Sequence, residues 1–158
     1  KENVNMLIKS VYETIKNIDS NVTFGISPQG NYENCMSQGA DVDTWLKNEG
    51  YIDYLMPQLY WSNDYDGTRL FSKRTRIFAS LRRHPRVLLY AGLGLYRAGQ
   101  DFEKDKGWIK RSDNISKQIN ILDNYGYKGY CLFSYSSLFS EEGKKEMNTL
   151  LDEHMDKK

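Results

Sequence analysis

The 158-residue sequence predicts an α/β fold built from parallel strand-helix units, and two observations support that prediction. First, four runs rich in β-branched and aromatic residues alternate with segments of helical spacing. Second, no linker and no low-complexity tract interrupts this alternation, which indicates a single unit over residues 1–158. Because strands that alternate with helices pair in parallel through right-handed crossovers, we expect a parallel sheet.

The chain opens with an amphipathic helix and a first strand. The apolar residues of the helix follow i, i+3, i+4 spacing; they are Val4, Leu7, Ile8, Val11, Tyr12, Ile15 and Ile18. The run 22–27 is β-rich and stops at Pro28, and the polar segment 29–34 is a predicted loop. Asp41 is placed to cap a short helix that Gly50 ends.

The second strand is predicted over residues 51–61. Its residues are apolar or aromatic with little alternation, as in a strand that is covered on both faces. It ends in Gln58, Leu59, Tyr60 and Trp61, which gather a carboxamide and two aromatic rings at one end. Since α/β folds bind ligands at the carboxyl ends of their strands, we expect this end to form the floor of a ligand site.

Two more units complete the alternation. A helix over 70–81 precedes a third strand over 86–96, which opens into a long loop. Ser112 is placed to cap a helix that Gly126 ends, and a fourth strand over 129–135 leads to a last helix. Two architectures fit these four strands and about five helices. One is a complete doubly wound sheet, and the other is half of a (β/α)8 barrel, which takes about 250 residues when whole.

Composition excludes several classes of partner. Lys plus Arg total 22 and Asp plus Glu 21, so the net charge of +1 gives no electrostatic case for nucleic acid or an anionic membrane. No apolar run approaches the roughly 20 residues of a membrane span. The histidines His84 and His154 and the cysteines Cys35 and Cys131 lack metal-ligand spacing, although one disulfide is possible. No nucleotide-binding motif is present, so no cofactor or metal is expected. The 12 tyrosines and 3 tryptophans favour stacking on sugar faces.

Several short motifs occur in a fixed order along the chain. They are Phe24-Gly25-Ile26-Ser27-Pro28, Asp41-x-x-x-Trp45-Leu46, Asp53-Tyr54-x-x-Pro57-Gln58-x-Tyr60-Trp61, Tyr90-x-Gly92-x-Gly94-x-Tyr96 and Gly129-x-x-x-Phe133-Ser134-Tyr135. In this order they resemble the glycosyl hydrolase-like 10 family, formerly domain of unknown function 187, over roughly residues 22–139. The resemblance implies the C-terminal half of a (β/α)8 barrel from a secreted or lipid-anchored bacterial protein. It also implies cleavage of peptidoglycan glycan strands that lack stem peptides.

The resemblance also identifies an acidic block that the sequence lacks. In the family, the strand before the first motif ends in Asp-Asp-Tyr-x-Tyr-Pro, a natural place for catalytic carboxylates. Glycoside hydrolysis commonly uses two carboxyl groups about 5–10 Å apart, so we expect the catalytic acids upstream of residue 1. Among the loop acids Glu33, Asp64, Asp66 and Asp101, we keep Asp64 as the catalytic candidate, against the simpler interpretation of a solvated turn residue.

The predicted substrate-binding residues are polar or aromatic side chains near strand ends. Gln58 offers a donor and an acceptor for a sugar hydroxyl or N-acetyl group, and Trp61 offers a flat face for a pyranose ring. The alternative is that Gln58 caps loop amides and Trp61 plugs the top of the barrel. The full predicted set is Asn31, Gln58, Tyr60, Trp61, Tyr96 and Tyr135.

The sequence thus predicts the substrate-binding half of a bacterial cell-wall glycoside hydrolase that is located outside the cell or in its envelope. A non-catalytic carbohydrate-binding module and a self-associating structural half-barrel are the two alternatives. Open strand edges and an apolar inner face would favour self-association or pairing with a missing N-terminal half.

Overall fold

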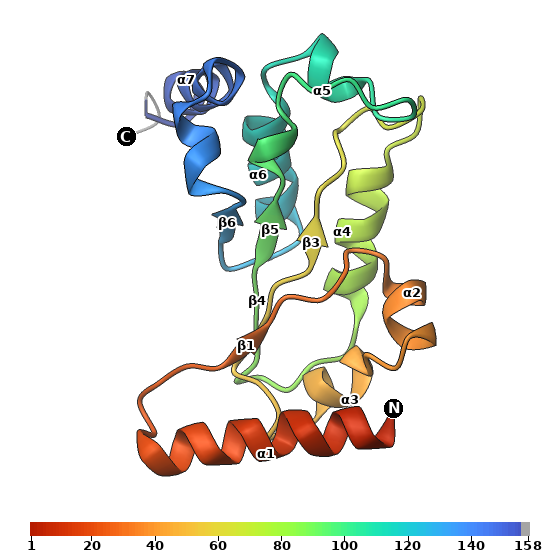
Figure 1. Ribbon diagram of the computed structural model, residues 1–158, viewed down its shortest axis with the longest axis vertical. Helices are drawn as coiled ribbons and strands as arrows, with labels where there is room; N and C mark the ends of the chain where they lie inside the picture. The colour runs from red at the N-terminus through yellow and green to blue at the C-terminus, as the bar shows by residue number, and fades with distance from the viewer. Residues whose placement is uncertain (156–158) are drawn as a thin grey trace.

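The computed structural model describes residues 1–155 and consists of parallel strands with helices α4 and α6 along one face (Figure 1). The helices are α1 (Glu2–Ile18), α2 (Tyr32–Ser37), α3 (Val42–Lys47), α4 (Leu70–Ser80), α5 (Gly107–Lys110), α6 (Asn114–Asn124) and α7 (Glu141–Met155), with 3-10 turns η1 (Leu95–Arg97) and η2 (Tyr135–Phe139). The strands are β1 (Gly25–Ile26), β2 (Tyr54–Leu55), β3 (Gln58–Leu59), β4 (Leu88–Leu89), β5 (Ala91–Leu93) and β6 (Tyr130–Leu132).

The short strands form four consecutive parallel runs, as predicted. They make two three-stranded sheets in the orders β1-β2-β4 and β3-β5-β6. Backbone bonds continue the pairing of the runs between the two sheets, because the Met56 amide donates to the Ile26 carbonyl and the Tyr90 amide to the Leu55 carbonyl, each at 2.9 Å. The break between β2 and β3 includes Pro57, which has no amide hydrogen to donate. This arrangement is consistent with half of a (β/α) barrel.

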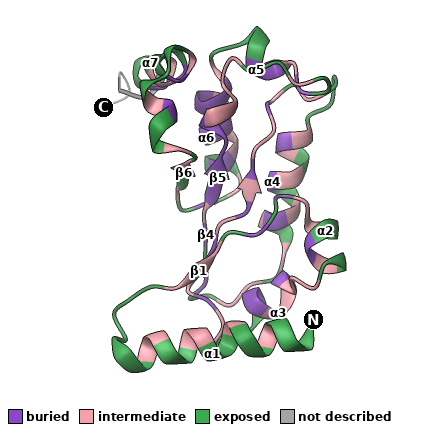
Figure 2. Ribbon diagram, viewed as in Figure 1, coloured by how far each residue is buried: buried purple, intermediate pink, exposed green. Residues whose placement is uncertain are grey.

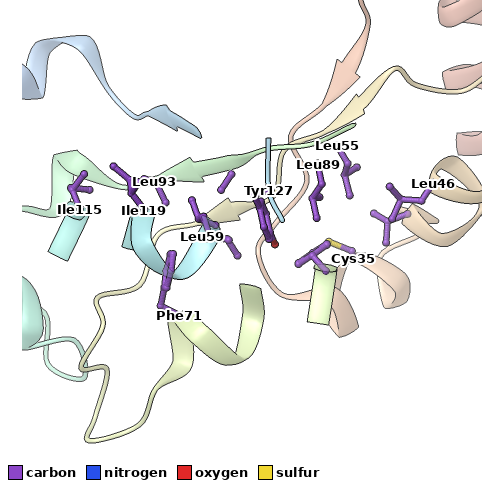
Figure 3. Close-up of a cluster of buried hydrophobic side chains, with 14 of the residues drawn as sticks. Cys35, Leu46, Leu55, Leu59, Phe71, Leu89, Leu93, Ile115, Ile119 and Tyr127 are labelled. Carbon is purple, nitrogen blue, oxygen red and sulfur yellow. The ribbon is translucent and has the colours of Figure 1, made fainter. Parts of the chain in front are cut away.

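The hydrophobic core lies between the strands and the helices (Figure 3). Leu55 and Leu59 are fully buried on the helix side of the second run, with Phe71 of α4 and Ile115 of α6 in the same cluster. Tyr127 enters this core and donates from its hydroxyl to the Thr75 carbonyl at 3.0 Å. The predicted amphipathic faces of α4 and α6 are therefore confirmed.

The opposite, inner face of the strand runs is open, as expected for half of a barrel, although the apolar residues of the second strand also indicated cover on both of its faces. Tyr54, Met56 and Leu88 line a cavity of about 370 Å3 on this inner face. Leu88 is 38% exposed and Phe133, just after β6, is 53% exposed. The run 51–61 has apolar residues on both faces, but helices of this chain cover only one of them.

Helix α1 lies across the lower end of the molecule, and none of its residues is buried (Figure 2). The Asn5 side chain attaches it to α3, because its Nδ2 donates to Asp41 at 3.1 Å and its Oδ1 accepts from Trp45 Nε1 at 2.6 Å. Lys16 pairs with Asp53 at 2.8 Å near the start of β2. Polar contacts thus hold the predicted amphipathic helix in place.

The helix boundaries refine the prediction in two loops. The structure has seven α-helices within the described residues, against about five expected, because α2 and α5 are short helices inside predicted loops. Asn31 caps α2 through its side-chain oxygen, which accepts from the Asn34 amide at 3.3 Å. Asp41 caps α3 as predicted. Both cysteines are free, so the possible disulfide between Cys35 and Cys131 does not form.

The predicted cap at Ser112 is wrong. The N-cap position of α6 is Asp113, whose side chain makes no capping hydrogen bond. Glu146 of α7 takes that role from a distance in the sequence, since its carboxylate accepts from the Ile115 amide at 2.9 Å and from Asn114 Nδ2 at 3.1 Å. Burial raises the pKa of Glu146. A tertiary contact has replaced the local cap that the sequence suggested.

Candidate functional site

A cavity of about 230 Å3 lies at the carboxyl ends of the first three strand runs. Its walls come from the loop after β1, from the end of β3 and from η1, and they comprise Gln29, Gly30, Asn31, Asn34, Gln58, Tyr60, Trp61 and Arg97. Four of the six predicted substrate-binding residues therefore lie together: Asn31, Gln58, Tyr60 and Trp61. They lie at the strand ends where α/β folds bind their ligands.

Gln58 is fixed by the neighbouring strand run. Its side-chain Nε2 donates to the Ser27 carbonyl at 3.0 Å, and its backbone amide donates to the Pro28 carbonyl at 2.9 Å. The first bond orients the carboxamide and uses one of its two donor hydrogens, which leaves the carbonyl oxygen as an acceptor for a ligand. Asn31 complements it, because its oxygen caps α2 and its amino group is the part left for a ligand.

Trp61 is half-buried and is held from several sides. Its carbonyl accepts from Gln118 Nε2 at 3.0 Å, and the Arg74 guanidinium lies 5.9 Å from the centre of its ring. Gly30 packs against it so closely that a Cβ there would lie 2.6 Å from the indole ring and 2.3 Å from the Gln58 carbonyl oxygen. Glycine is therefore required at position 30, because any side chain would push apart the groups that form the cavity.

Three aromatic rings extend the site from the ends of the second, third and fourth strand runs. Tyr60 stacks on Phe133 with ring centres 5.7 Å apart and an angle of 17° between the planes. Tyr96 meets both rings edge-on, each at 5.7 Å. Burial raises the pKa of the Tyr60 hydroxyl, so this group stays protonated at neutral pH. Tyr96 thus contacts the site through Tyr60, although it does not line the cavity.

Arg97 and Asp105 belong to the site and were missed by sequence reasoning. Arg97 lines the cavity, and its Nη1 lies 3.8 Å from the Asp105 carboxylate. Asp105 is 1% exposed and accepts hydrogen bonds from both the amide and the hydroxyl of the buried Ser62. Ser62 directly follows Trp61, so Asp105 links the loop after β3 to the loop before α5. Only the burial of Asp105 distinguishes it from the other loop acids, and burial cannot be read from the sequence.

Tyr135 and Asp64 lie away from this cavity. The Tyr135 ring is 75% exposed and packs edge-on against Phe139 at 5.1 Å. Asp64 is exposed in the loop after β3, and its amide donates to the Ser62 hydroxyl at 3.2 Å. Neither side chain lines the cavity that holds Gln58 and Trp61.

Of the remaining acidic candidates, two form ion pairs, and Asp66 is exposed in the turn before α4. Glu33 pairs with Arg74, and Asp101 pairs with Lys106. No carboxylate of the described residues lines the cavity, and these residues contain no cluster of three metal-ligating side chains. The His154 side chain lies outside the described part of the chain. No helix in residues 1–155 is long and apolar enough to cross a membrane.

The cavity combines carboxamides with aromatic faces. Carboxamides hydrogen-bond to hydroxyl and N-acetyl groups, and aromatic rings stack on the apolar faces of sugars. The fold and the site together therefore define a partial (β/α) barrel whose strand ends are suited to carbohydrate. The chain belongs to the family described as Glycosyl hydrolase-like 10, whose profile matches residues 1–110. This match includes α1 and ends before the fourth strand run, so the last of the predicted family motifs lies outside it.

Two curated relatives have names in agreement with this family. The chain is 26% identical over 140 residues to the Glycosyl hydrolase DigH of Escherichia coli K12, covering 78% of this chain and 31% of the relative. It is 28% identical over 157 residues to the Glycosyl hydrolase YngK of Bacillus subtilis, covering 87% of this chain and 29% of the relative. The chain thus spans less than a third of the length of these relatives. No solved structure matches the sequence.

Proposed function

We propose that this chain supplies the substrate-binding residues of a bacterial glycoside hydrolase that acts on cell-wall glycan of the peptidoglycan type. The observation that carries the proposal is the single cavity that gathers Asn31, Gln58, Tyr60 and Trp61 from two neighbouring strand ends. Membership of a glycosyl hydrolase-like family supports the same reading. Because such a substrate lies outside the cytoplasm, the proposal places the protein in the cell envelope or the extracellular space.

The proposal assigns the catalytic carboxyl groups to strands outside this chain. Glycoside hydrolysis commonly places two carboxyl groups across the scissile bond, and no described carboxylate lines the cavity. The open inner face around Met56 and Leu88 supports a partner on that side, because exposed apolar patches of this kind mark sites of protein association. We propose the preceding strand-helix units of a longer protein as that partner, with a second copy as the substitute when they are absent.

The test compares this chain alone with a full-length protein that contains it. Both are incubated with peptide-free peptidoglycan strands, and the products are detected by mass spectrometry. We expect cleavage only by the full-length protein, since both carboxyl groups are then present. If the isolated chain cleaves the strands and Asp64→Asn abolishes that cleavage, the catalytic carboxyl group belongs to this chain. That result would overturn the assignment of the catalytic carboxyl groups to other strands.

Binding without hydrolysis distinguishes the main alternative. If the full-length protein binds the strands through this cavity and never cleaves them, the chain is part of a carbohydrate-binding module. The observation that favours this second candidate is that no carboxylate lines the cavity within the described part of the chain. Isothermal titration calorimetry with N-acetylglucosamine tetramer measures binding independently of turnover.

A further inference from the structure

One cation lines a cavity whose other described lining residues are neutral. Apart from the aromatic rings and Gly30, the walls are carboxamides, and Arg97 is the single charged side chain among the described lining residues. A guanidinium stays protonated at any physiological pH. A neutral sugar is recognised well enough by carboxamides and aromatic faces, so the charge calls for a separate explanation.

The Arg97 guanidinium is held in a fixed orientation. Its Nε donates to the Tyr96 hydroxyl at 3.1 Å, and its central carbon lies 4.4 Å from the centre of the Phe102 ring and 5.4 Å from that of Tyr96. An arginine that is stacked in this way loses little further freedom on binding a ligand. The aromatic contacts thus pre-organise a positive group at the wall of the cavity.

Arg97 retains donors for a ligand. A guanidinium has five N–H groups, and the Tyr96 hydroxyl uses one of them. The Asp105 carboxylate lies 3.8 Å from Nη1, which is too far for a hydrogen bond. Asp105 already accepts from the amide and hydroxyl of Ser62. The Arg97 side chain remains 24% exposed, so it is accessible from the cavity.

We propose that Arg97 binds a carboxylate carried by a sugar ring of the ligand, which makes it a specificity-determining residue for acidic glycans. This inference rests on the proposed function. The planar guanidinium matches a carboxylate with two parallel hydrogen bonds, and the carboxamides then bind the hydroxyl and N-acetyl groups of the same glycan. The carboxylate has two chemical sources in such glycans: a lactyl ether on a hexosamine, or the ring carboxylate of a uronic acid.

The test measures the affinity of this chain for three tetrasaccharides by calorimetry. One is the neutral N-acetylglucosamine oligomer, one alternates N-acetylglucosamine with peptide-free N-acetylmuramic acid, and one alternates N-acetylglucosamine with glucuronic acid. We expect at least one acidic probe to bind about tenfold tighter than the neutral one, or about 1.4 kcal/mol. The acidic probe that is preferred identifies the source of the carboxylate.

Arg97→Gln should abolish this preference, so that the acidic and neutral probes bind the variant with affinities that differ by less than about twofold. Arg97→Lys keeps the charge beside Asp105 but loses the planar fork, so part of the preference should remain. Arg69→Gln is the matched control, because it removes the same charge from an exposed arginine that lines a different cavity. Melting temperatures show whether each variant is folded.

Two outcomes overturn the inference in different ways. If all three probes bind equally, or if Arg97→Gln leaves the acidic preference intact, the carboxylate assignment fails and the proposed function stands. If the chain and the full-length protein bind none of the probes, the proposed function fails and the inference fails with it.

Discussion

Replacing Asp105 with alanine tests whether a single buried carboxylate holds together the two loops beside the cavity. Asp105 and Ser62 are 1% and 0% exposed, and they lie 43 positions apart in the sequence. The Ser62 amide lies 3.2 Å from Asp105 Oδ2, and the Ser62 hydroxyl also donates to Asp105. Removal of the carboxylate leaves both Ser62 donors buried without an acceptor.

The expected loss follows from these two donors. A buried donor that loses its partner costs about 1–3 kcal/mol, so the two together cost about 2–6 kcal/mol. The ion pair with Arg97 adds little, because Arg97 is partly exposed and 3.8 Å away. We therefore expect Asp105→Ala to lower the free energy of unfolding by about 4 kcal/mol. Asp105→Asn keeps one acceptor oxygen and should lose about half as much.

Urea unfolding monitored by tryptophan fluorescence measures this loss by linear extrapolation. Asp101→Ala is the control, because it removes an exposed acid of the same loop and should cost less than about 0.5 kcal/mol. If the free energy of unfolding of Asp105→Ala lies within about 1 kcal/mol of that of the unmodified chain, other contacts hold the two loops together and the linking role of Asp105 is wrong.

Four further outcomes are expected. Trp61→Ala should weaken binding of N-acetylglucosamine tetramer by about 1–3 kcal/mol in calorimetry. Tyr135→Ala, outside the cavity, should change the binding free energy by less than about 0.5 kcal/mol. Equal effects of the two variants would show that Trp61 is not a binding residue. Gly30→Ala should lower both affinity and melting temperature, because its Cβ would overlap the Gln58 carbonyl, and an unchanged affinity would contradict the close packing. Burial raises the pKa of Glu146 above its ordinary value of 4.5, so the folded chain binds this proton more tightly than the unfolded chain does. The free energy of unfolding therefore falls as pH rises above about 4.5. Glu146→Gln should flatten this dependence of stability on pH, and an unchanged dependence would show that Glu146 is not its source. Light scattering should detect self-association at high micromolar concentration, and Phe133→Asp on the exposed inner face should reduce it; a monomeric unmodified chain would contradict this.

Local chemistry made much of the fold predictable. The helix spacing around Ile115, the cap at Asp41 and the β-rich runs that end at Pro28 and Trp61 depend on neighbours a few residues apart. The positions of these helices, caps and strands could therefore be predicted from the sequence. The sequence also predicted that Gln58 and Trp61 share a site, because both lie at the end of one predicted strand run and parallel strands present their carboxyl ends together.

Other features depend on contacts between distant segments. The local sequence around Ser112 is typical of a helix cap, but Glu146 of α7 accepts the hydrogen bond from the first turn of α6 instead. Apolar residues occupy both faces of the run 51–61, and the strand pattern alone indicates cover on both; the structure shows that helices of this chain cover one of them.

By itself, the sequence determined the parallel strand-helix order and the carboxamide and aromatic character of the ligand site. The tertiary structure alone decided which strand ends meet, and so separated Asn31 and Trp61, which share a cavity, from Tyr135, which is exposed. It also showed that Arg97 and Asp105 belong beside that cavity. The physical reason is that burial and charge pairing arise only when loops far apart in the chain pack together, and no local pattern encodes that packing.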